Sequence, residues 1–484
     1  MTSVTTRTDE TTSPPTPPDP SPSEQPATPG VWAHVRPLLH RLHFYAGILV
    51  GPFLVLAALT GLVYAATPTI EQVVHRHELF VDAPVAEPLS LFDQVQAARA
   101  VYPEGAVTQV RPAAAPDRTT AVVLAADDLP EGLTRTVFVD PGTLEVRGAL
   151  ATSGDALPFR AWVSELHASL HLGAAGRLYS ETAASWLWVV VLGGLAMWVA
   201  RVARTRRLRR LVVPEVRSAR PHKRVLSWHG AVGTLIALVL LGLSATGLTW
   251  SAYAGENVES LRHALGWATP AVDPSLSAEA AAASAAAHEG HGDGGPAMML
   301  EMGPGVNGVH SIARAEGLRA PLVMTPPADH GQAWVVRENQ RQWPTQADAI
   351  AVNGNDGTTV DRLDFADYPL AAKLARWGID AHMGTLFGFW NQVVLAVVAV
   401  GLVALVVIGY RLWWLRRPTS SASWRPGPAV PRGALRRAPL WLTVTVLALA
   451  AAVGVFLPLF GIPLAVFLLV DLALAARARR RAAA

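Results

Sequence analysis

Two apolar stretches that each begin with a histidine constrain this chain more than any other feature. They are residues 43–64, HFYAGILVGPFLVLAALTGLVY, and residues 229–250, HGAVGTLIALVLLGLSATGLTW. A shift of 186 residues superimposes His43 on His229 and also aligns a glycine and a Thr-Gly pair. An uncharged run of this length can cross about 30 Å of hydrocarbon as a helix. The sequence therefore predicts membrane-spanning helices that occur as repeated copies.

The composition agrees with a membrane protein and limits the chemistry. Hydrophobic residues make up 51 % of the chain and charged residues 16 %. Clusters of arginine follow or precede the apolar stretches, which is typical of cytoplasmic anchors and argues against nucleic-acid binding. The chain has no cysteine, which excludes disulfides, iron–sulfur clusters, thiolate zinc sites and haem attached through C-x-x-C-H. A cofactor would have to be held by histidine, carboxylate, methionine or backbone groups.

The basic flanks predict one orientation for six spans. Further uncharged stretches occupy residues 183–200, 230–255, 383–410 and 438–470. The last of these is interrupted by LPLFGIP and has basic residues on both sides, so we predict a helical hairpin there. Pro68 is predicted to mark the outer end of the first span. The chain is thus expected in the cytoplasmic membrane, with both termini cytoplasmic and residues 71–182 and 256–382 outside.

A second repeat relates the even-numbered spans. The stretch HASLHLGAAGR, from His167, matches HMGTLFGFWNQ, from His382, with a shift of 215 residues. The external segments have the patterns of small α+β units. In the first we expect a helix over 89–101, strands at 107–110, 120–124, 136–139 and 144–146, and a turn at Asp140–Gly142. In the second we expect a helix over 305–316 and strands at 322–325, 333–337, 349–352 and 359–363.

The predicted fold class is a multi-pass α-helical membrane protein. It has two pseudo-symmetric repeats, each made of a span, an external α+β unit and a span, followed by a C-terminal helical hairpin. The predicted segments are a disordered cytoplasmic tail (1–30), span 1 (36–70), external unit 1 (71–155), an outer approach helix with span 2 (156–203), a basic cytoplasmic loop (204–224), span 3 (225–255), an external segment with unit 2 (256–370), an outer approach helix with span 4 (371–417), a cytoplasmic loop (418–437), span 5 (438–457) and span 6 (461–477).

These features together resemble the PepSY-associated transmembrane proteins. The resemblance is carried by the histidine-opened helix ending in TGLVY or TGLTW, by LHASLHLG before span 2, and by the unit that closes with VDPGTLEV. It covers roughly residues 36–417. It implies PepSY-like external domains and places the chain among iron-regulated membrane proteins and ferric-siderophore reductases, which carry b-type haem. The turn DPGTLE departs slightly from the usual D-x-x-T-G-E.

Two pairs of histidines are the candidate haem ligands. Histidine is the usual axial ligand of non-covalent haem, and an ionisable side chain at a membrane span suggests function. His43 and His229 would lie at the cytoplasmic ends of spans 1 and 3. His167 and His382 would lie on the outer approach to spans 2 and 4. For each residue the alternative is an interfacial histidine without a ligand.

The remaining histidines have weaker support. His171 follows His167 by one helical turn, but its repeat counterpart is Leu386, so we rank it behind the two pairs. His77 and His263 align with one another, yet both lie in polar segments. The loop with His288, His291 and three methionines could sample a soft metal such as copper, but its Gly/Ala-rich sequence fixes no geometry.

The predicted function is that of a haem-containing membrane oxidoreductase. Two b-type haems would pass electrons across the membrane to ferric iron in a siderophore or similar chelate. The chain has no nucleotide-binding motif, so the donor would be separate, either membrane quinol or a soluble reductase. The alternatives are a non-enzymatic PepSY protein that binds or regulates an extracytoplasmic peptidase, and a component for uptake of a metal or its chelate. Membrane lipid is the other expected partner.

Overall fold

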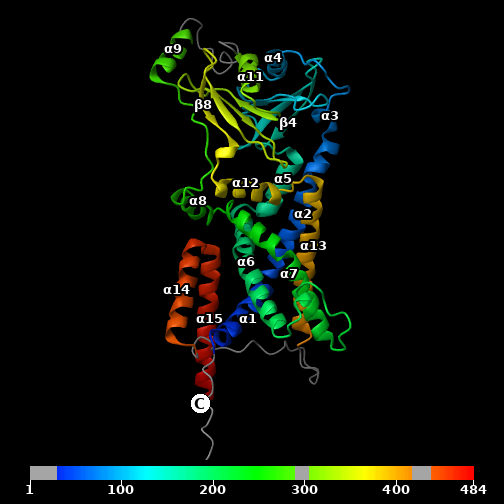
Figure 1. The fold of residues 1–484 in the computed structure, drawn as a ribbon, viewed down its shortest axis with the longest axis vertical. Coiled ribbons are helices and arrows are strands. Elements are labelled where there is room, and N and C mark those ends of the chain that lie inside the picture. Colours follow the sequence, from blue (N-terminus) through cyan, green and yellow to red (C-terminus); the bar gives the residue numbers. More distant parts are fainter. Residues whose placement is uncertain (1–29, 289–304, 417–437, 484) are drawn as a thin grey trace, which may run out of the picture.

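The computed structural model describes residues 30–288, 305–416 and 438–483. A β-sheet with covering helices forms one end of the molecule, and long helices form the other (Figure 1). Five helices are long and apolar enough to cross a membrane, and the 17-residue α14 (Leu440–Phe456) is a shorter apolar helix. The predicted multi-pass helical membrane protein with α+β portions is thereby confirmed, with about five candidate spans. The predicted tail, the loop 418–437 and the His/Met loop between 289 and 304 lie outside the described residues.

The long helices pack around a shared apolar core. The five candidate spans are α2 (Gly51–Val74), α6 (Gly173–Ala203), α7 (Pro221–Leu248), α13 (Phe389–Trp414) and α15 (Pro458–Ala483). α13 packs against α2 and α7, while α6 packs against α7 and against α1 (Val31–Leu49). Large apolar side chains such as Leu238 and Val455 are exposed on the outer surface, as expected where helices face lipid rather than water.

The first predicted span, residues 36–70, is divided into two helices. α1 and α2 meet at Val50, two residues before Pro52. Proline has no backbone N–H, so Pro52 cannot bond to the carbonyl of Ile48 four residues earlier. The hydroxyl of Tyr410 donates to that carbonyl instead, at 2.7 Å. The break therefore leaves that carbonyl paired, as backbone at membrane depth requires.

The prediction that Pro68 ends the first span is wrong. α2 continues through Pro68 to Val74. The Thr67 hydroxyl donates to the carbonyl of Tyr64 at 2.8 Å, which is the acceptor that a proline at position 68 leaves without its helical N–H. A neighbouring hydroxyl thus allows the helix to pass the proline.

The two predicted external units form one antiparallel sheet. Its strands are β1 (Val107–Arg111), β2 (Thr120–Leu124), β3 (Thr134–Val139), β4 (Val146–Thr152), β5 (Leu322–Thr325), β6 (Trp334–Glu338), β7 (Ala349–Val352) and β8 (Thr359–Leu363). Their order is β4-β3-β2-β1-β5-β6-β7-β8. β1 meets β5 at Val110 and Met324, so two four-stranded meanders are joined edge to edge.

Helices cover the sheet on the side away from the membrane helices. α4 (Leu91–Val101) and α11 (Gly305–Ala315) lie on that side (Figure 1). Both contribute fully buried side chains, including Val95 and Val309, to the core of the sheet. The strand expected at 144–146 lies farther along the chain: β4 begins only at Val146 and runs to Thr152, because Leu144 has a left-handed backbone with φ of 63°.

Short helices connect the sheet to the long helices. α5 (Pro158–Ser169) precedes α6, and α12 (Leu370–His382) precedes α13; both lie between the two layers (Figure 1). The other short elements are α3 (Arg76–Leu79), η1 (Leu208–Leu211), α8 (Gly255–Ala264), α9 (Ala278–His288) and η2 (Phe365–Asp367).

The C-terminal helices α14 and α15 lie side by side and attach to the bundle through polar contacts (Figure 1). Arg41 of α1 forms an ion pair with Asp471 of α15. The Trp186 indole donates to the Leu459 carbonyl at 3.1 Å, the acceptor that Pro463 leaves without its helical donor. Paired charges and satisfied carbonyls allow these groups to remain in apolar surroundings.

Candidate functional site

His43 and His229 meet at the end of the helical bundle farther from the sheet. His43 is on α1 and His229 is on α7. Their ring centroids lie 6.1 Å apart and the ring planes are inclined at 81°. Nδ1 of His43 lies 2.8 Å from the carbonyl of Val190. Because a carbonyl can only accept, Nδ1 carries the proton and Nε2 keeps its lone pair.

His229 differs from His43 in its hydrogen bonding. Its Nδ1 is buried and makes no well-formed hydrogen bond, although the carbonyl of Leu405 lies close enough to act as a weak acceptor for the ring. A buried imidazole nitrogen without a partner costs free energy unless another group binds there. The pair therefore offers one nitrogen with a fixed lone pair and a second ring whose orientation is set mainly by packing.

Because glycine has no side chain, two glycines make room for the rings of His43 and His229. A Cβ atom added to Gly194 would lie 2.8 Å from Cε1 of His43, closer than real contacts allow. A Cβ added to Gly409 would lie 3.8 Å from Cε1 of His229. The sequence aligns these glycines under the 215-residue shift but does not indicate that they face the histidines. Gly194 is therefore a site residue that the sequence analysis missed.

His167 and His382 lie at the other end of the bundle, beneath the sheet. His167 is on α5 and His382 is the last residue of α12. Nδ1 of His167 is 2.8 Å from the hydroxyl of Thr60, and Nδ1 of His382 is 2.6 Å from the hydroxyl of Thr246. Each histidine thus contacts the threonine of a Thr-Gly pair, which lies in the middle of α2 for His167 and near the end of α7 for His382.

The two threonines determine which nitrogen of each histidine is free. The Thr60 hydroxyl also lies 2.9 Å from the Leu56 carbonyl, and the Thr246 hydroxyl lies 2.8 Å from the Gly242 carbonyl. A hydroxyl has one proton, so when it donates to a carbonyl its oxygen accepts from Nδ1–H of the histidine. Nε2 then keeps its lone pair, which is the arrangement seen where histidine binds a metal and a polar neighbour orients it.

Residues next to these threonines also pack against His167 and His382, which we call the proximal pair because they lie nearer the sheet than His43 and His229, the distal pair. A Cβ added to Gly61 would lie 3.2 Å from Cε1 of His167, and one added to Gly247 would lie 3.9 Å from Cε1 of His382. The ring of Tyr64 stacks on His167 with centroids 6.5 Å apart. Trp250 meets His382 edge-on at 5.6 Å.

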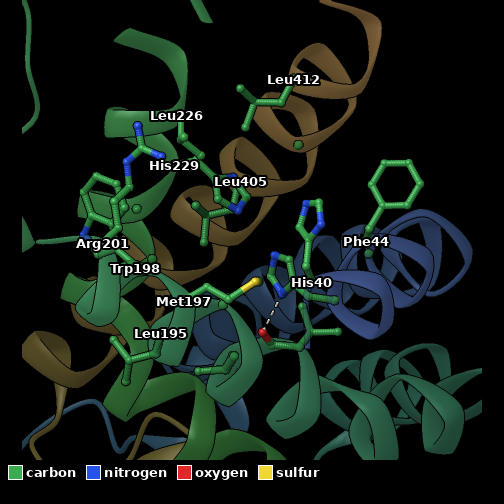
Figure 2. A pocket seen from close by; sticks show the side chains of 18 of the residues that line it. His40, Phe44, Leu195, Met197, Trp198, Arg201, Leu226, His229, Leu405 and Leu412 are labelled. Atoms are coloured by element: carbon green, nitrogen blue, oxygen red, sulfur yellow. Dashed lines mark hydrogen bonds between the residues drawn. The ribbon is translucent and has the colours of Figure 1, made fainter. Parts of the chain in front are cut away.

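Each histidine pair opens into a large cavity. The distal cavity, which is lined by His43 and His229, measures about 1000 Å³. The proximal cavity, which is lined by His167 and His382, measures about 1080 Å³. Both lie at the upper end of the range of roughly 300–1000 Å³ that is usual for ligand pockets. Figure 2 shows His229, His40 and Phe44 around the distal cavity.

One layer of leucines separates the two cavities. The same four leucines line both of them: Leu54, Leu187, Leu240 and Leu402. Leu54 is 3 % exposed and Leu240 is 2 % exposed, so the layer is closely packed. The cavities are therefore neighbours inside one bundle but are divided by apolar side chains.

The distal pair fits an iron held between two imidazoles. With a metal–nitrogen bond of about 2.0 Å and about 1 Å from nitrogen to ring centre, two axial imidazoles have centroids about 6 Å apart. The observed separation is 6.1 Å. His167 and His382 line one cavity and act on each other electrostatically. Among the described residues, no three His, Asp or Glu side chains cluster as a metal site.

Burial keeps the proximal histidines neutral. It lowers the pKa of His382 to about 4, with a smaller effect from the charge of His167, and it also lowers the pKa of His167. Neutral imidazole is the form that binds metal. Nearby, burial raises the pKa of Asp380, while the guanidinium groups of Arg376 and Arg341 oppose that rise.

His171 and the polar-segment histidines lie apart from both pairs. His171 is exposed, has φ of 57° and packs against Trp162 with ring centroids 4.8 Å apart. It is not among the residues that line either cavity. His77 contacts Arg147 at 3.0 Å, and His263 is exposed beside Glu259.

The chain matches a known protein family. The family model described as the PepSY-associated TM region matches residues 40–416, a range that contains all four paired histidines, the whole sheet and most of the residues that line the two cavities. A comparison with curated proteins finds no match for the chain.

Proposed function

This chain belongs to the PepSY-associated transmembrane family, and we propose that it is a haem-containing oxidoreductase of the cytoplasmic membrane. It would take electrons from membrane quinol or a soluble reductase and deliver them to ferric iron in an extracytoplasmic chelate such as a siderophore. The observation that carries this proposal is the pairing of imidazoles in two cavities at opposite ends of one helical bundle.

We also propose that the two pairs belong to two copies of one unit. Shifts of 186 and 215 residues relate the odd-numbered and even-numbered spans. The Thr60–His167 contact corresponds under these shifts to Thr246–His382, and both contacts are present. The leucine layer follows the same rule, because Leu54 corresponds to Leu240 and Leu187 to Leu402. Two equivalent binding sites are the expected result of such a duplication.

The chain's own groups would hold two b-type haems as axial ligands, His43 with His229 and His167 with His382. The cofactor supplies one-electron exchange at its iron. The protein orients the ligands: Val190, Thr60 and Thr246 fix the ring tautomers, and glycines leave room for the rings. The leucine layer keeps water out of the space between the cavities.

The orientation follows from the basic residues. Arginines cluster beyond the distal cavity, whereas the sheet lies beyond the proximal cavity (Figure 1). By the positive-inside rule the distal cavity would face the cytoplasm and the sheet would be extracytoplasmic. The donor would then reach the distal site, and the ferric chelate would reach the proximal one. Transfer of one electron to Fe(III) gives the softer Fe(II), which a hard-oxygen chelate holds less tightly.

The test is an absorption spectrum of the purified protein in detergent, after expression with haem available. We expect a b-type Soret band and α-band, with about half of the haem lost in His43→Ala/His229→Ala and the other half in His167→Ala/His382→Ala. His171→Ala is the matched control, because it lies four residues after His167, beyond the end of α5, and outside the cavity. Colourless protein without ferric-chelate reduction, or haem unaffected by both double variants, would refute the proposal.

A further inference from the structure

All the charged side chains at the rim of the distal cavity, among the described residues that line it, are arginines. Four arginines line it: Arg36, Arg201, Arg204 and Arg416. His34, His40 and His222 line it as well. No Asp or Glu is among the described residues that line this cavity. The salt bridges formed nearby use other arginines, Arg41 with Asp471 and Arg210 with Glu215.

These cations come from different elements and converge. Arg36 is on α1, Arg201 is on α6, and Arg416 follows the end of α13. The guanidinium of Arg416 acts electrostatically on His40 of α1 and also on His222 of α7. In Figure 2, Arg201 and His40 flank the space in which His229 lies. The charges therefore surround one opening rather than spreading over a flat surface.

Two of the arginines are each seven residues after a glycine that faces one of the distal histidines. Arg201 is seven residues after Gly194, which faces His43, and Arg416 is seven residues after Gly409, which faces His229. Seven residues are almost two helical turns, so Arg201, which is still within α6, lies on the same helix face as Gly194 and about 10 Å along the axis. Arg416 lies two residues beyond the end of α13. A ligand between the histidines would therefore have an arginine from α6 and one that follows α13 beside its outward edge.

The proximal cavity differs, because it does not have the same excess of positive charge. Arginines line it too, but so do four carboxylates: Asp155, Glu165, Glu181 and Asp380. Asp155 pairs with Arg111 and Arg341, and Asp380 pairs with Arg341 and Arg376. Carboxylates therefore balance most of the positive charge in the proximal cavity, whereas the described residues that line the distal cavity include arginines but no carboxylate.

From this arrangement we infer that the distal rim binds carboxylate groups of a porphyrin whose ring lies between His43 and His229, with Arg201 and Arg416 as the principal partners. Guanidinium binds carboxylate through paired, charge-assisted hydrogen bonds. The inference rests on the proposed function and adds to it: the acidic edge of the distal ligand faces the rim. The rim and the histidines line a single cavity, which favours this ligand over a separate surface anion.

The test compares iron protoporphyrin IX with its dimethyl ester, which has no free carboxylates. The protein carries His167→Ala/His382→Ala, so that only the distal pair remains, and binding is followed by absorbance titration in a neutral detergent. We expect the diacid to bind at least about tenfold more tightly than the diester, because one charge-assisted hydrogen bond contributes enough free energy to change the affinity by about that factor. Arg201→Gln/Arg416→Gln should lower diacid affinity by at least about tenfold and leave diester affinity unchanged.

Matched variants separate the possible results. Arg207→Gln/Arg209→Gln removes two arginines at η1, shortly after α6, that do not line the cavity, and it should keep the preference. Arg201→Lys/Arg416→Lys should keep part of the preference for the diacid, because the positive charge remains.

Equal binding of diacid and diester by the protein with an unaltered rim overturns this inference but leaves the proposed haem site intact. Binding of neither porphyrin refutes the proposed function instead. Loss of co-purifying phosphatidylglycerol in the glutamine variant, with the porphyrin preference unchanged, assigns the rim to lipid phosphate and also overturns the inference.

Discussion

The two cavities hold similar histidine pairs by different means. In the distal cavity the histidines belong to helices of the bundle itself, and a backbone carbonyl orients His43. In the proximal cavity they belong to the short helices α5 and α12, and threonine hydroxyls of the long helices orient them. A pair of imidazoles can thus be positioned by two helices of the bundle itself, or by two short helices that pack against the bundle.

The difference extends to the surroundings of each site. The proximal cavity depends on ion pairs that join the sheet region to α12: Arg341 follows β6 and contacts both Asp155 and Asp380. Burial opposes ionisation of Asp155, but Arg111 and Arg341 outweigh it and hold the pKa of Asp155 below its usual range. The distal cavity has no such tie to the sheet among its described lining residues. Changes in the sheet region should therefore affect one site and spare the other.

The largest expected effect is at Asp380, whose side chain is fully buried between Arg341 and Arg376. Asp380→Ala leaves two guanidinium groups without this partner, which should cost about 3–5 kcal/mol of stability. Thermal unfolding and haem content should show loss of the proximal site with the distal site retained. The control is Asp364→Ala, which removes a partly exposed pair with Arg362 and should cost about 1 kcal/mol or less. Equal loss at both sites would contradict the separation of the two regions.

The next effect concerns the hydroxyls that orient the proximal histidines. Thr60→Val removes the acceptor for His167 Nδ1, and loss of such a partner typically weakens metal binding by about 10–100-fold. Haem retention measured by dilution should fall at the proximal site only. Thr60→Ser should restore it, because the hydroxyl remains. Unchanged retention in the valine variant would show that the hydroxyl does not determine the ligand tautomer.

A smaller effect should appear at the glycines beside His43. Gly194→Ala places a methyl group 2.8 Å from Cε1 of the ring, whereas a Cβ added to the adjacent Gly193 lies 3.8 Å from Cβ of His43. Overpacking by one methyl costs about 1 kcal/mol at the low end of the usual range. Gly194→Ala should therefore weaken distal haem binding about fivefold, and Gly193→Ala should not. Similar behaviour of the two variants in a haem titration would argue against close packing at this ring.

The smallest expected effect is at the break between α1 and α2. Tyr410→Phe removes the donor to the Ile48 carbonyl, and hydrogen bonds within membrane proteins average about 0.6 kcal/mol. A small loss of thermal stability should accompany a slight weakening of the distal site, which Tyr410 also lines. Tyr45→Phe serves as the control, because its ring contacts Phe467 outside the cavity. Preferential damage to the proximal site would contradict this assignment.

Much of the arrangement could be predicted from periodicity alone. Uncharged runs of sufficient length indicated the spans, because membrane crossing depends on length and hydropathy. Equal shifts along the sequence suggested that His43 belongs with His229 and His167 with His382 before any packing was known. Strand positions such as 120–124 and 349–352 followed from alternating apolar residues bounded by turn residues.

Contacts between segments could not be predicted in the same way. The sequence does not show that Thr60 faces His167 or that Gly194 faces His43, because these contacts depend on how helices cross. It suggested two separate external units, whereas pairing of β1 with β5 makes one sheet.

The amino-acid sequence by itself determined which residues are apolar, where the histidines recur and which segments are basic. Only the tertiary structure decided that four leucines divide two cavities, that the described lining of the distal cavity has arginines without carboxylates, and that carboxylates such as Asp155 and Asp380 pair with arginines at the proximal cavity. The physical reason is that hydropathy and spacing act along the chain, whereas cavities and charge balance arise from side chains that meet across helices.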